Sequence, residues 1–173
     1  MRMLLTFAKI LLVLLVVLVA WLAVRMNAQP TAFRRQIVVN VPPRIAWDYF
    51  NRPKQWVSWL GEANAPTAVG PTDVLGPDST ASFAGNFTFH MTTFQPYVHW
   101  MWSAPLGPMT IDYDHTFEPI NDRQTRIVFH QSVRGFGNDV MALLLGGITA
   151  VSGHQAALNK LAAEINALPE ASK

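Results

Sequence analysis

The chain has 173 residues, half of them hydrophobic and only 14% charged, so we expect a single globular domain and exclude a disordered, highly charged tail protein. It contains no cysteine, which excludes disulfides, thiolate metal sites and a cysteine nucleophile. The net charge of +2 arises in the first 28 residues, because the remainder carries 10 of the 13 basic residues and all 11 acidic ones. We therefore expect no nucleic-acid partner.

Residues 3–24 predict a helix that crosses a membrane. Residues 10–24 are all apolar, and 22 helical residues span about 33 Å, close to the roughly 30 Å hydrocarbon core of a bilayer. We expect residues 1–28 to form a single-pass anchor and linker, and residues 29–173 to form a domain on the extracytoplasmic, periplasmic side. A cleaved signal peptide is the alternative, although neither candidate cleavage site has a small first residue.

The alternation of apolar and polar residues predicts an antiparallel sheet with one dry face. A first strand over 33–41 ends at Pro42-Pro43, and two short helices follow over 44–50 and 53–59. Residues 61–82 are rich in turns and carry only a weak strand signal. Further strands are expected over 87–94, 97–102, 109–118 and 124–133.

A two-residue turn at Gln95-Pro96 would fix the register of one hairpin in this sheet. It would place residue 92 opposite 99 and residue 90 opposite 101. Trp100 and Trp102 would then share the dry face with the aromatic and sulfur side chains of residues 89 and 91, whereas His90 and His99 would face solvent.

The last predicted element is a long helix over 139–168. Its apolar stripe keeps one face through steps of three and four residues, with Asn138 as a cap and Pro169 as a stop. Thirty helical residues span about 45 Å, enough to lie across a whole sheet. The order of elements predicts an α+β fold in which this helix covers the dry face.

This pattern resembles the START / polyketide cyclase (SRPBCC) superfamily, whose helix-grip fold wraps a curved antiparallel sheet around a long C-terminal helix. Here one transmembrane helix would precede that fold. The resemblance rests on residues 37–43 leading into Trp47-Asp48-Tyr49-Phe50, on residues 51–56, on Thr116-Phe117-Glu118-Pro119, on Thr125-Arg126-Ile127 and on the helix that ends in Leu161 and Glu164. It implies a deep apolar cavity between sheet and helix that binds lipids, sterols, polyketides or other hydrophobic molecules, and some members are cyclases or hydratases.

Aromatic and polar side chains on the dry face and on the helix stripe are the candidate ligand-binding residues. Rings can hold an apolar guest, while an imidazole, phenol or amide can orient its polar group. Gly147 would either hollow the helix face or allow close packing on a ring. The candidates are Trp100, Trp102, Tyr113, His115, Phe129, Gln131, Gly147 and His154.

No motif in the sequence carries a specific chemistry. It lacks Gly-x-Ser-x-Gly, His-Glu-x-x-His, a calcium loop and a nucleotide-binding glycine loop. We assign no catalytic residue, metal or cofactor, and expect a membrane-anchored domain that binds a hydrophobic small molecule or lipid. One alternative is a cyclase- or hydratase-like enzyme with His115 or His154 as base and Tyr113 as donor. Another is a structural or interaction module with a solid core.

Overall fold

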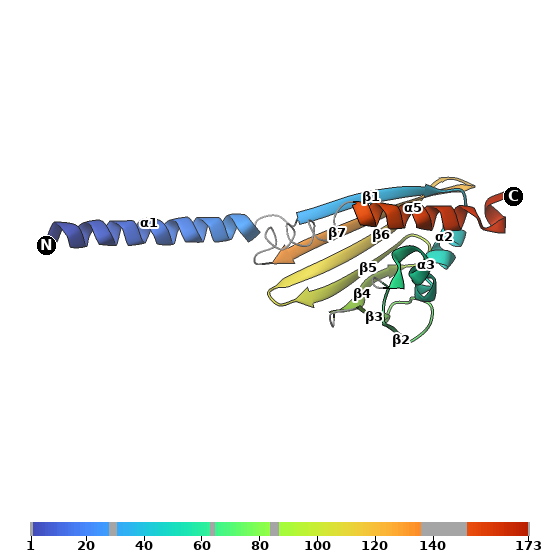
Figure 1. The fold of residues 1–173 in the computed structure, drawn as a ribbon, viewed down its shortest axis with the longest axis horizontal. Coiled ribbons are helices and arrows are strands. Elements are labelled where there is room, and N and C mark those ends of the chain that lie inside the picture. The colour runs from blue at the N-terminus through green and yellow to red at the C-terminus, as the bar shows by residue number, and fades with distance from the viewer. Residues whose placement is uncertain (1, 28–30, 63–64, 84–86, 136–151, 173) are drawn as a thin grey trace.

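The computed structural model describes residues 2–27, 31–62, 65–83, 87–135 and 152–172, and Figure 1 shows their arrangement. Within these described residues, three α-helices, two 3-10 turns and seven strands follow the N-terminal helix. The elements are α1 (Arg2–Asn27), β1 (Thr31–Val39), α2 (Pro43–Phe50), the 3-10 turn η1 (Pro53–Gln55), α3 (Trp56–Leu60), β2 (Ala68–Gly70), β3 (Thr80–Phe83), β4 (Phe87–Gln95), β5 (His99–Leu106), β6 (Met109–Asn121), β7 (Gln124–Gly135), α5 (Ser152–Asn166) and the 3-10 turn η3 (Pro169–Ser172).

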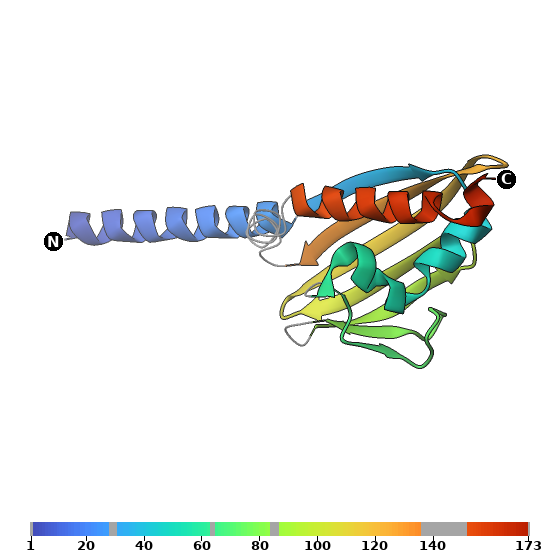
Figure 2. The same cartoon turned by 45° about the vertical axis from the view of Figure 1, so that its right-hand side comes forward.

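The strands form one antiparallel sheet in the order β1-β7-β6-β5-β4-β3-β2. In Figures 1 and 2, α2, α3 and α5 all lie on one face of this sheet, which we call the covered face, and α5 runs along β1. The predicted α+β class is confirmed: the antiparallel sheet, which has seven strands where the sequence predicts five, and the C-terminal helix fit the helix-grip fold. The short strands β2 and β3 fall in the segment where the sequence shows little strand signal.

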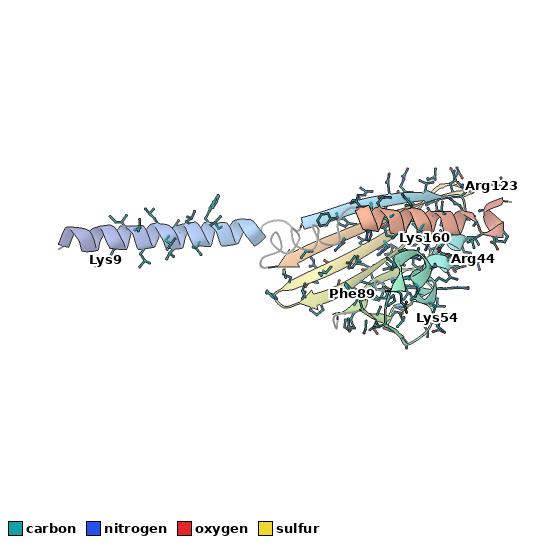
Figure 3. All side chains as sticks on the ribbon, in the orientation of Figure 1. Lys9, Arg44, Lys54, Phe89, Arg123 and Lys160 are labelled. Atoms are coloured by element: carbon teal, nitrogen blue, oxygen red, sulfur yellow. The ribbon has the colours of Figure 1, made fainter. Side chains whose placement is uncertain are left out.

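Helix α1 extends away from the sheet in Figure 1, and side chains project from it on several sides in Figure 3, where Lys9 is labelled. Its large apolar side chains between Ile10 and Leu22 are 43–70% exposed. In the part of the chain that the structure describes, no helix combines the length and the hydropathy needed to cross a membrane.

Helix α5 covers the sheet through the predicted stripe. Leu158, Leu161 and Ile165 are fully buried, and the helix ends just before Pro169, as predicted. The Glu164 carboxylate accepts hydrogen bonds from the Tyr49 hydroxyl at 2.8 Å and the Ser58 hydroxyl at 2.7 Å, so it ties α5 to α2 and α3. The first half of the predicted 30-residue helix, with Asn138 and Gly147, lies outside the described residues.

The predicted register of the β4–β5 hairpin is wrong, although its assignment of faces is right. Phe94 pairs with Trp100 and Met91 pairs with Trp102, with an irregularity between Met91 and Thr93. The extra residue of this bulge reverses the alternation within β4, which keeps Met91 and Phe94 on the same face. The turn is longer than two residues, and Tyr97 adopts a positive φ of 65° within it.

Candidate functional site

One half of the covered face is filled by aromatic rings, because side chains of α2 and α3 pack against rings of the strands. Phe50 at the end of α2 is 1% exposed and lies at the centre, with its ring centroid 5.3–5.8 Å from those of six other rings. We call this set the ring cluster: Trp47, Phe50, Trp56, Trp59, Trp100, His115, Phe117 and Phe129. The predicted site residues Trp100, His115 and Phe129 therefore lie in a packed region.

His115 is buried among three of these rings. Its imidazole stacks on Trp100 at a centroid distance of 3.9 Å and contacts Phe50 and Phe129. Burial, followed by the nearby His154 and His99, lowers the pKa of His115 from 6.5 to about 3. An imidazole with so low a pKa stays neutral near pH 7 and is a weak general base.

The other half of the covered face contains three polar side chains in one cross-strand row. Trp102 on β5 pairs with Tyr113 on β6, and Tyr113 pairs with Gln131 on β7. We call these three residues the β5–β7 row. Trp102 is 2% exposed, while Tyr113 and Gln131 are only half-buried. The row continues the face on which Trp100 lies, but its Tyr113–Gln131 end is outside the ring cluster.

The polar atoms of the β5–β7 row have no hydrogen-bond partners among the described residues. The Trp102 indole N–H is buried without an acceptor, and the Tyr113 hydroxyl and the Gln131 amide make no hydrogen bond. Burial also raises the pKa of the Tyr113 hydroxyl above its usual value of 10. A buried polar group without a partner costs about 1–3 kcal/mol, and this applies to the indole N–H of Trp102. The Tyr113 hydroxyl and the Gln131 amide are half-buried and free to bond with water or with a bound molecule.

Apolar side chains flank the β5–β7 row on both sides. Met91 pairs with Trp102 on one side, and Phe33 pairs with Gln131 on the other. Phe89, labelled on the sheet in Figure 3, packs edge-on against Tyr113 with ring centroids 5.2 Å apart. The row is therefore a polar strip within an apolar face, which is the composition expected of a small-molecule site.

Helix α5 brings His154 to the same side of the sheet. His154 is half-buried, and its pKa is lowered first by burial and then by the positive charge of Arg35 on β1. It also lies close enough to His115 to contribute to the lowered pKa there. The structure thus gathers seven of the predicted site residues on the covered face, while Gly147, the eighth, lies outside the described residues.

The acidic residues of β6 lie on the opposite face, as predicted. Asp112 is nevertheless buried, because Ser103, Ser132 and Arg134 all donate hydrogen bonds to its carboxylate. Burial alone would raise the pKa of Asp112, but these hydrogen bonds and the Arg134 charge lower it. This network explains how a carboxylate can be buried on the outer face of the sheet.

The histidines of the hairpin do not form a metal site. His90 pairs with Ser103, whereas His99 contacts Asp114 at 2.7 Å, so the two histidines do not lie opposite one another in the hairpin. Among the residues whose placement is described, no group of three or more His, Cys, Asp or Glu side chains could hold a metal ion.

Sequence reasoning missed the rings from the short helices and one basic residue on the covered face. Phe50, Trp56 and Trp59 fill the space over Trp100 that a ligand was expected to share. Arg35 pairs with Phe129 and so faces the same side as Ile37 and Val39. The sequence does contain a signal for this placement. Arg35 lies two residues before Ile37, and residues two apart in a strand share a face.

The geometry is that of a helix-grip domain, and comparison with known families agrees. Residues 30–166 match the family described as polyketide cyclase / dehydrase and lipid transport. This match covers most of the chain, and the protein therefore belongs to that family. No curated protein is similar enough to count as a relative.

Solved structures show the same fold at low sequence identity. A solution NMR structure of a protein from Thermobifida fusca is 16% identical, with a TM-score of 0.58 over 80% of this chain and 95% of its own. Truncated norcoclaurine synthase from Thalictrum flavum is 8% identical, with a TM-score of 0.61 over 81% and 96% of the two chains. CalU16 from Micromonospora echinospora is 14% identical, with a TM-score of 0.55 over 80% and 86%. At these identities the likeness establishes the fold alone.

Proposed function

We propose that this domain binds a hydrophobic small molecule or lipid on its covered face, along the β5–β7 row. The observation that carries the proposal is the alignment of Trp102, Tyr113 and Gln131 on neighbouring strands, flanked by apolar side chains and making no side-chain hydrogen bond within the described residues. The buried indole N–H of Trp102 lacks an acceptor, which such a group usually has in native proteins. Family membership supports the same conclusion, since the family description includes lipid transport.

The environment of His115 favours ligand binding over an enzyme that uses this histidine as a base. The limited extent of the ring cluster favours ligand binding over a structural module with a solid core. A catalytic base with a pKa of about 3 would take up protons poorly near neutral pH. The rings form a solid core over Trp100, His115 and Phe129, but the half-buried Tyr113 and Gln131 lie beyond it. The ligand would therefore contact the boundary of the cluster at Trp102.

Native mass spectrometry of the full chain after incubation with a membrane lipid extract tests this proposal. We expect the wild type to retain a small apolar molecule. Gln131→Trp would fill the end of the row and reduce retention about tenfold or more, the equivalent of about 1.4 kcal/mol. Tyr113→Phe removes only a hydroxyl and should weaken binding less, since it deletes one hydrogen bond and keeps the ring.

His130→Trp is the matched control for Gln131→Trp. It places the same bulky ring on the same strand, but on the outer face, where His130 pairs with Asp114 and Arg34. Retention should match that of the wild type. The proposal is wrong if the wild type retains no apolar molecule, or if a folded Gln131→Trp variant and Tyr113→Phe both retain it fully.

We also propose that α1 attaches the chain to a membrane, with the domain on the extracytoplasmic side. Support comes from the exposed apolar side chains between Ile10 and Leu22, because an apolar surface of this kind marks an interaction with lipid or protein. Fractionation should place the full chain with membranes, resistant to alkaline extraction. External protease should digest the domain in cells whose outer barrier is opened. Recovery in the soluble fraction contradicts attachment, and protection from protease contradicts the proposed side.

A further inference from the structure

Arg35 brings a guanidinium group to the covered face next to the proposed ligand. It pairs with Phe129 across β1 and β7, and Phe129 pairs with His115, so these side chains share that face. Gln131 is the diagonal neighbour of Arg35, and such neighbours lie roughly 7–8 Å apart, within reach of long side chains. The positive charge therefore lies beside one end of the β5–β7 row.

No carboxylate forms an ion pair with Arg35 anywhere in the described parts of the chain. The acids of β6 are engaged elsewhere, with Asp112 bound to Arg134, Asp114 to His99 and Glu118 to Arg126. Arg35 is half-buried, and its charge is felt by His154 on α5. A half-buried arginine without a counter-ion favours an anion as its partner.

The edge of the sheet gives access to Arg35. Arg34, Arg35 and Gln36 of β1 and Gln155 of α5 line a hollow of about 560 Å³. Because β1 is the edge strand and Arg34 and Gln36 face the outer side of the sheet, this hollow is an open depression along that edge that reaches Gln155 on α5. The guanidinium of Arg35 thus offers hydrogen-bond donors at this opening, beside the Gln155 amide, which donates one of its two N–H groups to Asn159 at 3.0 Å.

We propose that the ligand is an anionic amphiphile, whose carboxylate or phosphate binds Arg35 and whose apolar chain extends along the β5–β7 row. This inference rests on the proposed function and adds the charge and orientation of the ligand. The forked donors of a guanidinium match the oxygen atoms of a carboxylate or phosphate. From β1 to β5 the sheet covers three strand spacings, about 14 Å, which accommodates an extended acyl chain of medium length.

Calorimetric titration of the full chain with four probes of different charge and length tests the inference. The probes are decanoate, decyl phosphate, decanol and inorganic phosphate, each below its micelle concentration. We expect the two anionic amphiphiles to bind at least about tenfold more tightly than decanol, and inorganic phosphate to bind weakly because it lacks the chain. Decanoate and decyl phosphate distinguish a carboxylate ligand from a phosphate ligand.

Substitution of Arg35 gives the decisive comparison. Arg35→Gln should abolish the preference for anionic probes while decanol binding persists, and Arg35→Lys should keep part of the preference. The matched control Arg123→Gln removes an exposed arginine from the turn between β6 and β7, away from this hollow, and should keep the preference in full.

Each failure has a distinct meaning. Equal affinity for decanoate, decyl phosphate and decanol overturns the inference but leaves the proposed function intact. The same loss in Arg123→Gln and Arg35→Gln, or tight binding of inorganic phosphate, also overturns it, since either result describes a general basic surface. Absence of binding by all three decyl probes overturns the proposed function, and the inference with it.

Discussion

Replacing Phe50 with alanine should lower the free energy of unfolding by about 3–5 kcal/mol, the usual range for removing a buried phenylalanine ring. Phe50 is 1% exposed and contacts six other rings, including Trp100, His115 and Phe129 on three different strands. The cavity left behind would separate α2 from the sheet at the centre of the ring cluster. Equilibrium denaturation of the full chain, followed through its tryptophans, measures the loss.

Val57→Ala is the matched control for this variant. Val57 lies on the neighbouring helix α3 and is 46% exposed, so its side chain contributes little to the core. We expect a change within about 0.5 kcal/mol, as for most surface substitutions. A loss of less than about 1 kcal/mol for Phe50→Ala would contradict the packed ring cluster.

Acidification should destabilise the protein mainly through His115. Its pKa is about 3 in the folded protein and 6.5 in the unfolded chain, so between these values the unfolded state binds an additional proton. Stability is therefore complete above pH 6.5 and is lost as the pH falls toward 3. Between pH 7 and 4.5 this linkage amounts to about 2.5 kcal/mol. His154, whose pKa is also lowered, adds to the loss in the same direction.

The measurement is the free energy of unfolding as a function of pH for the wild type and for His115→Phe. The variant should remove most of the dependence between pH 4.5 and 7, because phenylalanine cannot be protonated. His90→Gln alters an exposed histidine of the outer face and should leave the wild-type slope unchanged. Equal slopes for the wild type and His115→Phe would show that His115 does not have the proposed environment. Protonation of Asp112 also lowers the free energy of unfolding, but its pKa is lowered from 3.8, so that loss occurs mainly below pH 4.5.

The faces of the long strands and of the last helix can be predicted from the sequence because each has a regular apolar period. The alternation in β6 places His115 and Phe117 inside and Asp114 outside, as observed. Likewise the stripe of α5 contains the fully buried Leu158 and Leu161. In both cases burial of one face dominates the local energetics, so pattern and structure agree.

The features that the sequence does not reveal depend on tertiary packing or on backbone irregularity. Strand β2 is only three residues long, too short to show an alternation. The bulge near Thr92 is a property of the backbone and has no signature in residue type. The position of Phe50 over Trp100 depends on how α2 docks against the sheet, which no local pattern encodes.

The residues of the candidate site could be predicted from the sequence, but their division into a packed ring cluster and a half-buried end of the β5–β7 row could not. Trp100 and Tyr113 were expected on one continuous cavity wall, yet the rings of the short helices bury the first and leave the second half-buried. Residue type alone places Arg35 in solvent, because arginine usually faces water, although its spacing of two residues from Ile37 indicates the covered face. A basic residue at an inward position is therefore an informative exception.

The short connection between α1 and β1 has a consequence for how a ligand would arrive. Helix α1 ends at Asn27, and Arg35 follows eight residues later on the edge strand. Even a fully extended chain of that length covers no more than about 26–29 Å, slightly less than the roughly 30 Å apolar thickness of a bilayer. If α1 attaches the chain to a membrane and Arg35 binds an amphiphile, as we propose, a ligand released from the same leaflet would meet Arg35 within that radius, and its capture would not require diffusion through the aqueous compartment.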